Sequence, residues 1–170
     1  MIGKKRKRRA AGILIGLLML FSAGGCSGAA PSPAPDASLV WLGYSCSHMD
    51  FSECFSFSIS EKEGEVLLDA SCFSYSREES GQRIEFSNVS VPAEEMERLR
   101  GLAETYDLAE ILRQNKPKED GIFICDETIY SLCAEWSDGT YLQADSAGEL
   151  KDSLREFFFT LAIRINGQTA

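Results

Sequence analysis

The residues whose types could carry chemistry gather around the single histidine of this chain, His48. Cys46 and Cys54 flank it in the spacing Cys-x-His-x5-Cys. Such side chains could bind zinc, or a thiol could act as a nucleophile beside an imidazole base. However, the spacing is not that of a zinc finger, the chain has no Cys-x2-Cys pair, and no third group that would orient the histidine can be identified. We therefore expect neither a metal site nor a catalytic site, and we keep an enzyme or metal-binding protein using Cys46 and His48 as the alternative.

The cysteines Cys72, Cys125 and Cys133 lie further along the chain. Strand alternation turns Cys72 toward the core, where a thiol behaves as a small apolar residue. Cys54 and Cys133 fall on the polar faces of their strands, so they could form a disulfide if those strands are neighbours. The sequence leaves the pairing among Cys46, Cys54, Cys72, Cys125 and Cys133 open.

Carboxylates form short clusters that could serve a glycosidase or bind calcium. These clusters are Glu61/Glu63/Glu65, Glu78/Glu79, Glu94/Glu95/Glu97 and Asp126/Glu127. Each falls at an expected turn or helix start, and no segment has the EF-hand pattern, so we expect solvated surface. The chain also lacks the Gly-x-Ser-x-Gly, Gly-x4-Gly-Lys-Ser/Thr and His-Glu-x2-His motifs, and we expect no cofactor.

The N-terminal stretch 4–26 has the composition of an export signal. Six basic residues at 4–9 precede a short apolar run at 13–21, then small residues and Cys26. Spanning a bilayer takes roughly 20 apolar residues, more than this run offers. The small residues followed by Cys26 resemble the lipobox of bacterial lipoproteins, with Ala23 where that family usually has Leu. The resemblance implies a diacylglycerol on the Cys26 sulfur and cleavage just before it.

This resemblance divides the chain into a signal peptide at 1–25, a flexible Pro/Ser/Ala-rich tether at 26–38 and one domain at 39–170. Positive charge stays on the cytoplasmic side, so we expect the rest of the chain on the extracytoplasmic face of the cell membrane. The whole chain carries 17 Lys and Arg against 26 Asp and Glu. Without the six basic residues of the signal, 11 face 26, for a net charge of −15. We expect no nucleic-acid partner, because so acidic a surface is repelled by phosphate backbones, and membrane contact only through the lipid.

Hydrophobic periodicity predicts an α+β fold: a mainly antiparallel sheet of about five strands, a meander plus a hairpin, with two amphipathic helices on one face. Strands are expected at 39–44, from Phe55 to Ile59, at 65–73, 83–89 and 128–136, and a return strand at 141–144 follows the Asp-Gly turn at 138–139. The register of 83–89 is not resolved. A helix starts near Pro92, with a possible further turn up to Gln114. A second starts at a capping box formed by Ser146 and Glu149 and ends near 166–167.

Aromatic side chains of the expected sheet could form a contact surface. The candidates are Trp41, Trp136, Tyr130 and Tyr141, but alternation favours a core position for Tyr130 and Trp136. The serine-rich outer face of the first strands is polar enough to be solvated and flat enough to receive a partner. The Trp136–Gly139 hairpin and the closing helix are similar to small uncharacterised lipoproteins of Gram-positive bacteria. We therefore expect a membrane-anchored binding module of the cell envelope, with an envelope protein or polymer as partner, rather than an enzyme.

Overall fold

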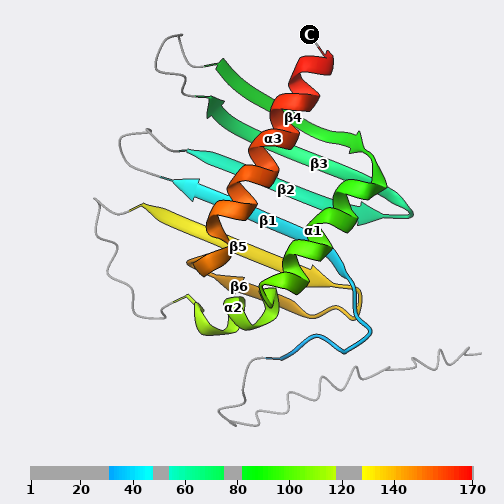
Figure 1. Ribbon diagram of the computed structural model, residues 1–170, viewed down its shortest axis with the longest axis vertical. Coiled ribbons are helices and arrows are strands. Elements are labelled where there is room, and N and C mark those ends of the chain that lie inside the picture. Colours follow the sequence, from blue (N-terminus) through cyan, green and yellow to red (C-terminus); the bar gives the residue numbers. More distant parts are fainter. Residues whose placement is uncertain (1–30, 48–53, 75–81, 118–127, 170) are drawn as a thin grey trace, which may run out of the picture.

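The computed structural model describes residues 31–47, 54–74, 82–117 and 128–169. They form one six-stranded sheet with helices against it (Figure 1). The strands are β1 (Leu39–Ser47), β2 (Phe55–Lys62), β3 (Glu65–Ser74), β4 (Gln82–Val91), β5 (Ile129–Trp136) and β6 (Tyr141–Ala144). The helices are α1 (Ala93–Thr105), α2 (Leu108–Gln114), a 3-10 turn η1 (Gly148–Leu150) and α3 (Lys151–Thr169). The predicted α+β class is confirmed, with six strands where about five were expected.

The strand order is β4-β3-β2-β1-β5-β6, and every neighbouring pair is antiparallel. The first four strands form the predicted meander. After β4 the chain crosses the sheet as α1 and α2, so that β5 pairs with β1 and not with β4 (Figure 1). β1 therefore lies inside the sheet, between β2 and β5.

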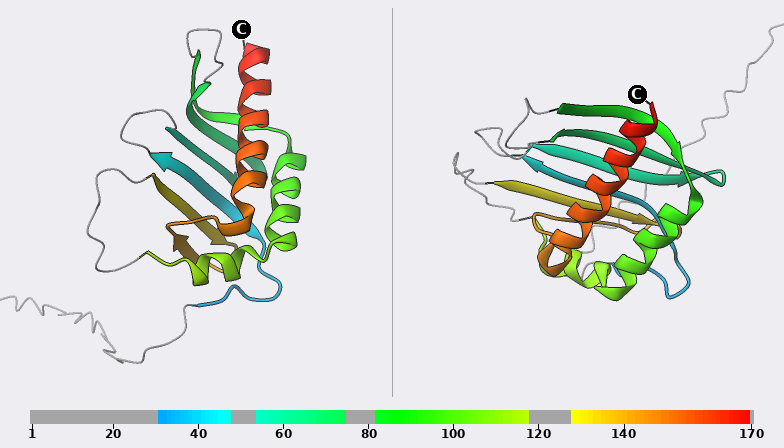
Figure 2. Two further views of the ribbon diagram at one scale, coloured as in Figure 1. Left: turned by 60° about the vertical axis from the view of Figure 1, so that its left-hand side comes forward. Right: turned by 45° about the horizontal axis from the view of Figure 1, so that its top comes forward.

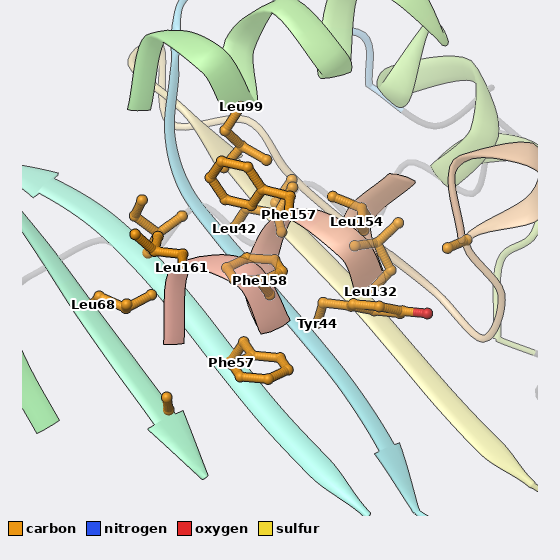
Figure 3. Close-up of a cluster of buried hydrophobic side chains, with 14 of the residues drawn as sticks. Leu42, Tyr44, Phe57, Leu68, Leu99, Leu132, Leu154, Phe157, Phe158 and Leu161 are labelled. Carbon is orange, nitrogen blue, oxygen red and sulfur yellow. The ribbon is translucent and has the colours of Figure 1, made fainter. Parts of the chain in front are cut away.

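All helices lie on the same side of the sheet (Figure 2). We call the sheet face beneath them the inner face. Period-two alternation places Phe57 and Leu68 there at 2% and 0% exposure, and Leu99 of α1 and Phe158 of α3 pack over them. Figure 3 shows these side chains meeting between sheet and helices. Phe57 and Phe158 stack in parallel, with ring centroids 5.2 Å apart. Burying such side chains stabilises a fold by roughly 1.5–3 kcal/mol each, so this layer sets the architecture.

A buried ion-pair cluster holds α3 against α1. Glu95 of α1 is 1% exposed, and its carboxylate accepts hydrogen bonds from Arg98 and from Arg164 of α3. Such a carboxylate must keep its partners, because an unpaired charge in a low-dielectric interior is costly.

The register that the sequence left open in β4 is explained by a bulge. Ala70 pairs with Phe86 and Leu68 with Val89, so two residues of β4 face Asp69 alone. One of the two, Asn88, has φ +53°, and its N–H donates to the Asp69 carboxylate at 2.8 Å. Asn tolerates this left-handed conformation better than most residues.

Two predicted helix boundaries were wrong. The Ser146 hydroxyl accepts from the N–H of Gly148, two residues on, and the chain makes the η1 turn before α3 starts at Lys151. Glu149 therefore lies inside this turn and not in a capping box. The closing helix continues to Thr169, beyond the expected end at 166–167. The possible turn up to Gln114 is the separate helix α2, capped by the side chain of Asp107.

Candidate functional site

The sheet face opposite the helices carries no covering element among the residues that the structure describes (Figure 2). We call it the outer face. Cross-strand pairing aligns its side chains in rows, because residues that pair directly point to the same side. One row is Ser131, Ser45, Ser56 and Ser71, and the next is Cys133, Gly43, Ser58 and Asp69. A third row is Tyr141, Glu135, Trp41, Ser60 and Leu67. These rows are mostly polar, and of the three only the last contains aromatic side chains.

Trp41 and Tyr141 form an aromatic pair on this face. Their ring centroids lie 6.3 Å apart with planes at 25°. The indole extends over Gly43, because a Cβ built on Gly43 would lie 2.7 Å from the Cη2 atom of Trp41. A side chain at position 43 would occupy the space that the indole now fills. Gly43 thus lets Trp41 lie close to the sheet.

Tyr141 lies over the neighbouring position of the same row. Its hydroxyl forms a hydrogen bond with the Cys133 thiol, which together with burial raises the pKa of Tyr141 to about 12. The Cys133 sulfur also lies 3.6 Å from the Ser131 hydroxyl. Because Cys133 pairs with Gly43, both rings lean from their own row toward the adjacent Gly43–Cys133 pair. We call Trp41 and Tyr141 in this arrangement the aromatic platform.

A hollow of about 460 Å³ adjoins the aromatic platform. Its polar lining comes from Ser60, Glu61, Lys62 and Glu135. Glu61 is held in place by Arg100 of α1, 2.5 Å away. The volume falls within the range of small-ligand sites, about 300–1,000 Å³. An apolar ring surface with hydroxyl and carboxylate groups at its border can bind a ligand that has both apolar faces and polar edges.

Comparisons with protein families, with curated proteins and with solved structures gave no match.

A second hollow, of about 670 Å³, lies between residues 32–39 and the helices α1 and α2. The chain itself supplies the polar contacts there. Asp138 accepts from the N–H of Ala34 at 2.7 Å, and Arg113 donates to the hydroxyl of Ser32. Arg100 donates to the Leu39 carbonyl at 2.9 Å. The last residues of the expected tether thus lie against the domain, and this hollow is accounted for by their docking.

The predicted chemistry-bearing residues are only partly described. Cys26, His48 and Cys125 lie outside the described residues. Cys46 faces inward at 3% exposure, which is a poor position for a nucleophile that must reach a substrate. Within the described ranges, no three His, Cys, Asp or Glu side chains come together as a metal site. None of the helices described has the length and apolar character needed to cross a bilayer.

The possible Cys54–Cys133 disulfide is ruled out by the strand order. Cys54 precedes β2 and Cys133 lies in the middle of β5, and β1 runs between these two strands. Directly opposed strands would be needed to bring the thiols within bridging distance. The inward position predicted for Cys72 is confirmed: it is 1% exposed, and burial raises the pKa of its thiol to about 11.

The inner face contains one polar group without a visible partner. Among the described residues, the buried hydroxyl of Tyr44 makes no hydrogen bond. Burial raises the pKa of this phenol, and the Phe55 and Tyr130 rings lie beside it. The ionisable groups of Cys46, Asp152 and Arg155 also lie near enough to influence the pKa of this phenol.

The core positions predicted for Tyr130 and Trp136 are confirmed, while the sequence assigned no face to Trp41 and Tyr141. Trp136 is 7% exposed and Tyr130 packs against the core, whereas Tyr141 is 50% exposed on the outer face. Sequence reasoning missed the roles of Gly43 and Cys133, because their contacts with Trp41 and Tyr141 depend on side-chain lean and strand order. A glycine two residues after an outward tryptophan in a strand was the available signal.

Proposed function

We propose that this chain is a lipid-anchored protein of the extracytoplasmic membrane face, whose domain is a binding module that uses the outer face. The observation that carries the binding part is the aromatic platform on a sheet face that the described helices leave uncovered. Exposed Trp and Tyr are the residue types that most often supply binding energy at recognition surfaces. The outer face offers an aromatic surface with a hollow beside it. Binding of a ligand requires no further group, whereas catalysis would require a reactive one.

The anchoring part rests on Cys26 and on the composition of residues 1–25. Its test is mass spectrometry of the mature N-terminus together with membrane fractionation of Cys26→Ala. We expect a diacylglyceryl group on Cys26, and no lipidated product from the variant. An unmodified Cys26 in the membrane fraction would contradict the anchor and leave the binding proposal standing.

The binding part is tested by photocrosslinking of the full chain in the cells that make it. One variant carries a benzophenone amino acid at Gln143, which is exposed on the outer face beside Cys133. The matched control carries it at Thr160, which is exposed on α3. We expect an envelope adduct from position 143, absent or much weaker from position 160. Equal adducts from both positions, or none from position 143, would contradict binding through the outer face.

A further inference from the structure

We infer that the hollow beside the aromatic platform binds an uncharged polysaccharide chain, whose pyranose rings stack on Trp41 and Tyr141. This inference rests on the proposed function, because it assigns a ligand class to the outer face. Three features of the platform support this ligand: its shape, the groups that border it and its charge.

The shape of the platform suits a flat ligand. The indole is held close over Gly43, because a Cβ at this position would lie 2.7 and 2.8 Å from the Cη2 and Cζ2 atoms of Trp41. The ring of Tyr141 stacks next to the indole, with its plane 25° from that of Trp41, and Tyr141 is 50% exposed. An aromatic face attracts the polarised C–H bonds on the apolar side of a pyranose ring, which has the matching flat shape. The exposed ring of Tyr141, supported by the indole, can therefore receive a sugar ring of a polysaccharide chain.

The groups around the platform are hydroxyls and carboxylates. Ser58 and Ser60 lie on one side of it in β2, Ser45 and Ser131 follow in the next row, and Glu135 lies between the two aromatic residues. Hydroxyl and carboxylate oxygens match the equatorial hydroxyl groups of a sugar, directly or through water.

The charge of the region argues against an anionic ligand. Among the residues that line the hollow, Glu135 and Lys62 balance each other, and the carboxylate of Glu61 is already paired with Arg100 of α1. Arg100 is already engaged by Glu61, Glu97 and the Leu39 carbonyl. A chain of phosphates would need several unengaged cations, and the strongly acidic composition of the chain would repel it. An uncharged polysaccharide avoids this repulsion and still uses the ring stacking.

The test uses the full chain in detergent with defined probes, cellohexaose and chitohexaose, and follows tryptophan fluorescence and calorimetry. Trp136 is buried on the inner face, so a ligand-dependent change in emission reports on Trp41. We expect saturable binding of at least one probe. Trp41→Ala should weaken it by about tenfold or more, since stacking residues carry much of the energy at such sites. A soluble polyphosphate should not bind.

Two further variants separate the platform from the fold. Gly43→Ala keeps both aromatic residues but displaces the indole, and it should weaken binding about as much as Trp41→Ala, with the circular dichroism unchanged. Ile129→Ala is the control: Ile129 is 47% exposed on the outer face at the far end of β5, outside the hollow, and binding should be unaffected.

The inference would be overturned if neither oligosaccharide binds. It would also be overturned if Trp41→Ala binds the oligosaccharides as tightly as the unmodified chain, or if polyphosphate binds as tightly as the oligosaccharides. If a protein adduct at position 143 is lost in Trp41→Ala while the sugars do not bind, the polysaccharide is wrong and the outer face remains the binding face. If the position 143 adduct is also absent, both proposals fail.

Discussion

The two faces of this sheet are built from the same strands with opposite chemistry. Along β2, Phe55, Phe57 and Ile59 point inward and are at most 5% exposed, while Ser56, Ser58 and Ser60 alternate with them on the outer face. The inner face is covered by α1 and α3, and its stability comes from the burial of apolar area. The outer face has no such cover in the described part of the chain, and its aromatic side chains contribute little to the core.

The comparison separates residues that build the fold from residues available for recognition. Aromatic rings on the inner face stack against other core rings, as Phe57 does with Phe158. The platform rings contact each other, Gly43 and Cys133. An aromatic side chain on a polar and uncovered face is therefore better explained by binding than by stability. Substitutions on the inner face should therefore lower the stability of the fold, whereas substitutions of the platform should weaken binding.

The largest effect is expected from Phe158→Ala. Phe158 is fully buried and stacked on Phe57, so its truncation should leave a cavity and lower the free energy of unfolding by about 4 kcal/mol. Tyr141→Ala removes a ring of similar size from the outer face and should cost less than about 1 kcal/mol. Chemical denaturation of both variants measures the difference. If both variants lose a similar free energy of unfolding, the ring of Tyr141 contributes to stability as much as a core ring, and the two faces do not differ in this way.

A smaller effect is expected when the ion-pair cluster between α1 and α3 is broken. Arg164→Ala should lower the free energy of unfolding by about 2 kcal/mol, because the buried Glu95 loses one charged hydrogen-bond donor while Arg98 still pairs with it. Arg83→Ala is the control: Arg83 and Glu85 are each 58% exposed, and breaking their pair should cost less than about 0.5 kcal/mol. A negligible loss in Arg164→Ala would show that the cluster does not fix the helix layer.

Much of the fold could be predicted, because the alternation of apolar and polar residues along a strand indicates which side of that strand is buried. The serines and aromatics of β2 identify their faces without any structure, and the Asp-Gly turn before β6 identifies a hairpin. Strand order could not be predicted in this way. Nothing in the local sequence of β5 indicates that its partner is β1, nearly ninety positions earlier, because the pairing depends on the crossing of α1 and α2.

The candidate site was only half predictable for the same reason. The sequence names Trp41 and Tyr141 as candidates for a contact surface, but they become a pair only because β5 alone separates their strands. Likewise, the possible Cys54–Cys133 bridge failed on strand order. The bulge opposite Asp69 shifts the later residues of β4, and its only sequence signal is an Asn, which is common in many other settings.

Cys133 and Cys72 offer a direct comparison of the two faces by titration. We expect Cys133→Ala to lower the pKa of Tyr141 from about 12 toward its ordinary value of 10.0, since the hydrogen bond that favours the neutral phenol is lost. That hydrogen bond stabilises the fold fully below pH 10 and loses its effect as the pH rises toward 12, where the phenol ionises. Difference absorbance of the phenolate measures the shift. Cys72→Ala, on the inner face, should leave the titration of Tyr141 unchanged, and an equal shift in both variants would refute the specific contact.

The smallest effect should be a gain in stability that leaves both faces intact. Glu63 and Gly64 join β2 to β3 with φ of +54° and +82°, and two-residue hairpin turns of this kind favour Asn-Gly. Glu63→Asn should raise the free energy of unfolding by about 0.5 kcal/mol, because Asn enters the left-handed region at lower cost than Glu. Glu65→Asn, within the strand, should give no such gain. Oligosaccharide binding should be unchanged in Glu63→Asn, because the turn has no part in the platform; a change in affinity would mean that the turn and the platform are coupled.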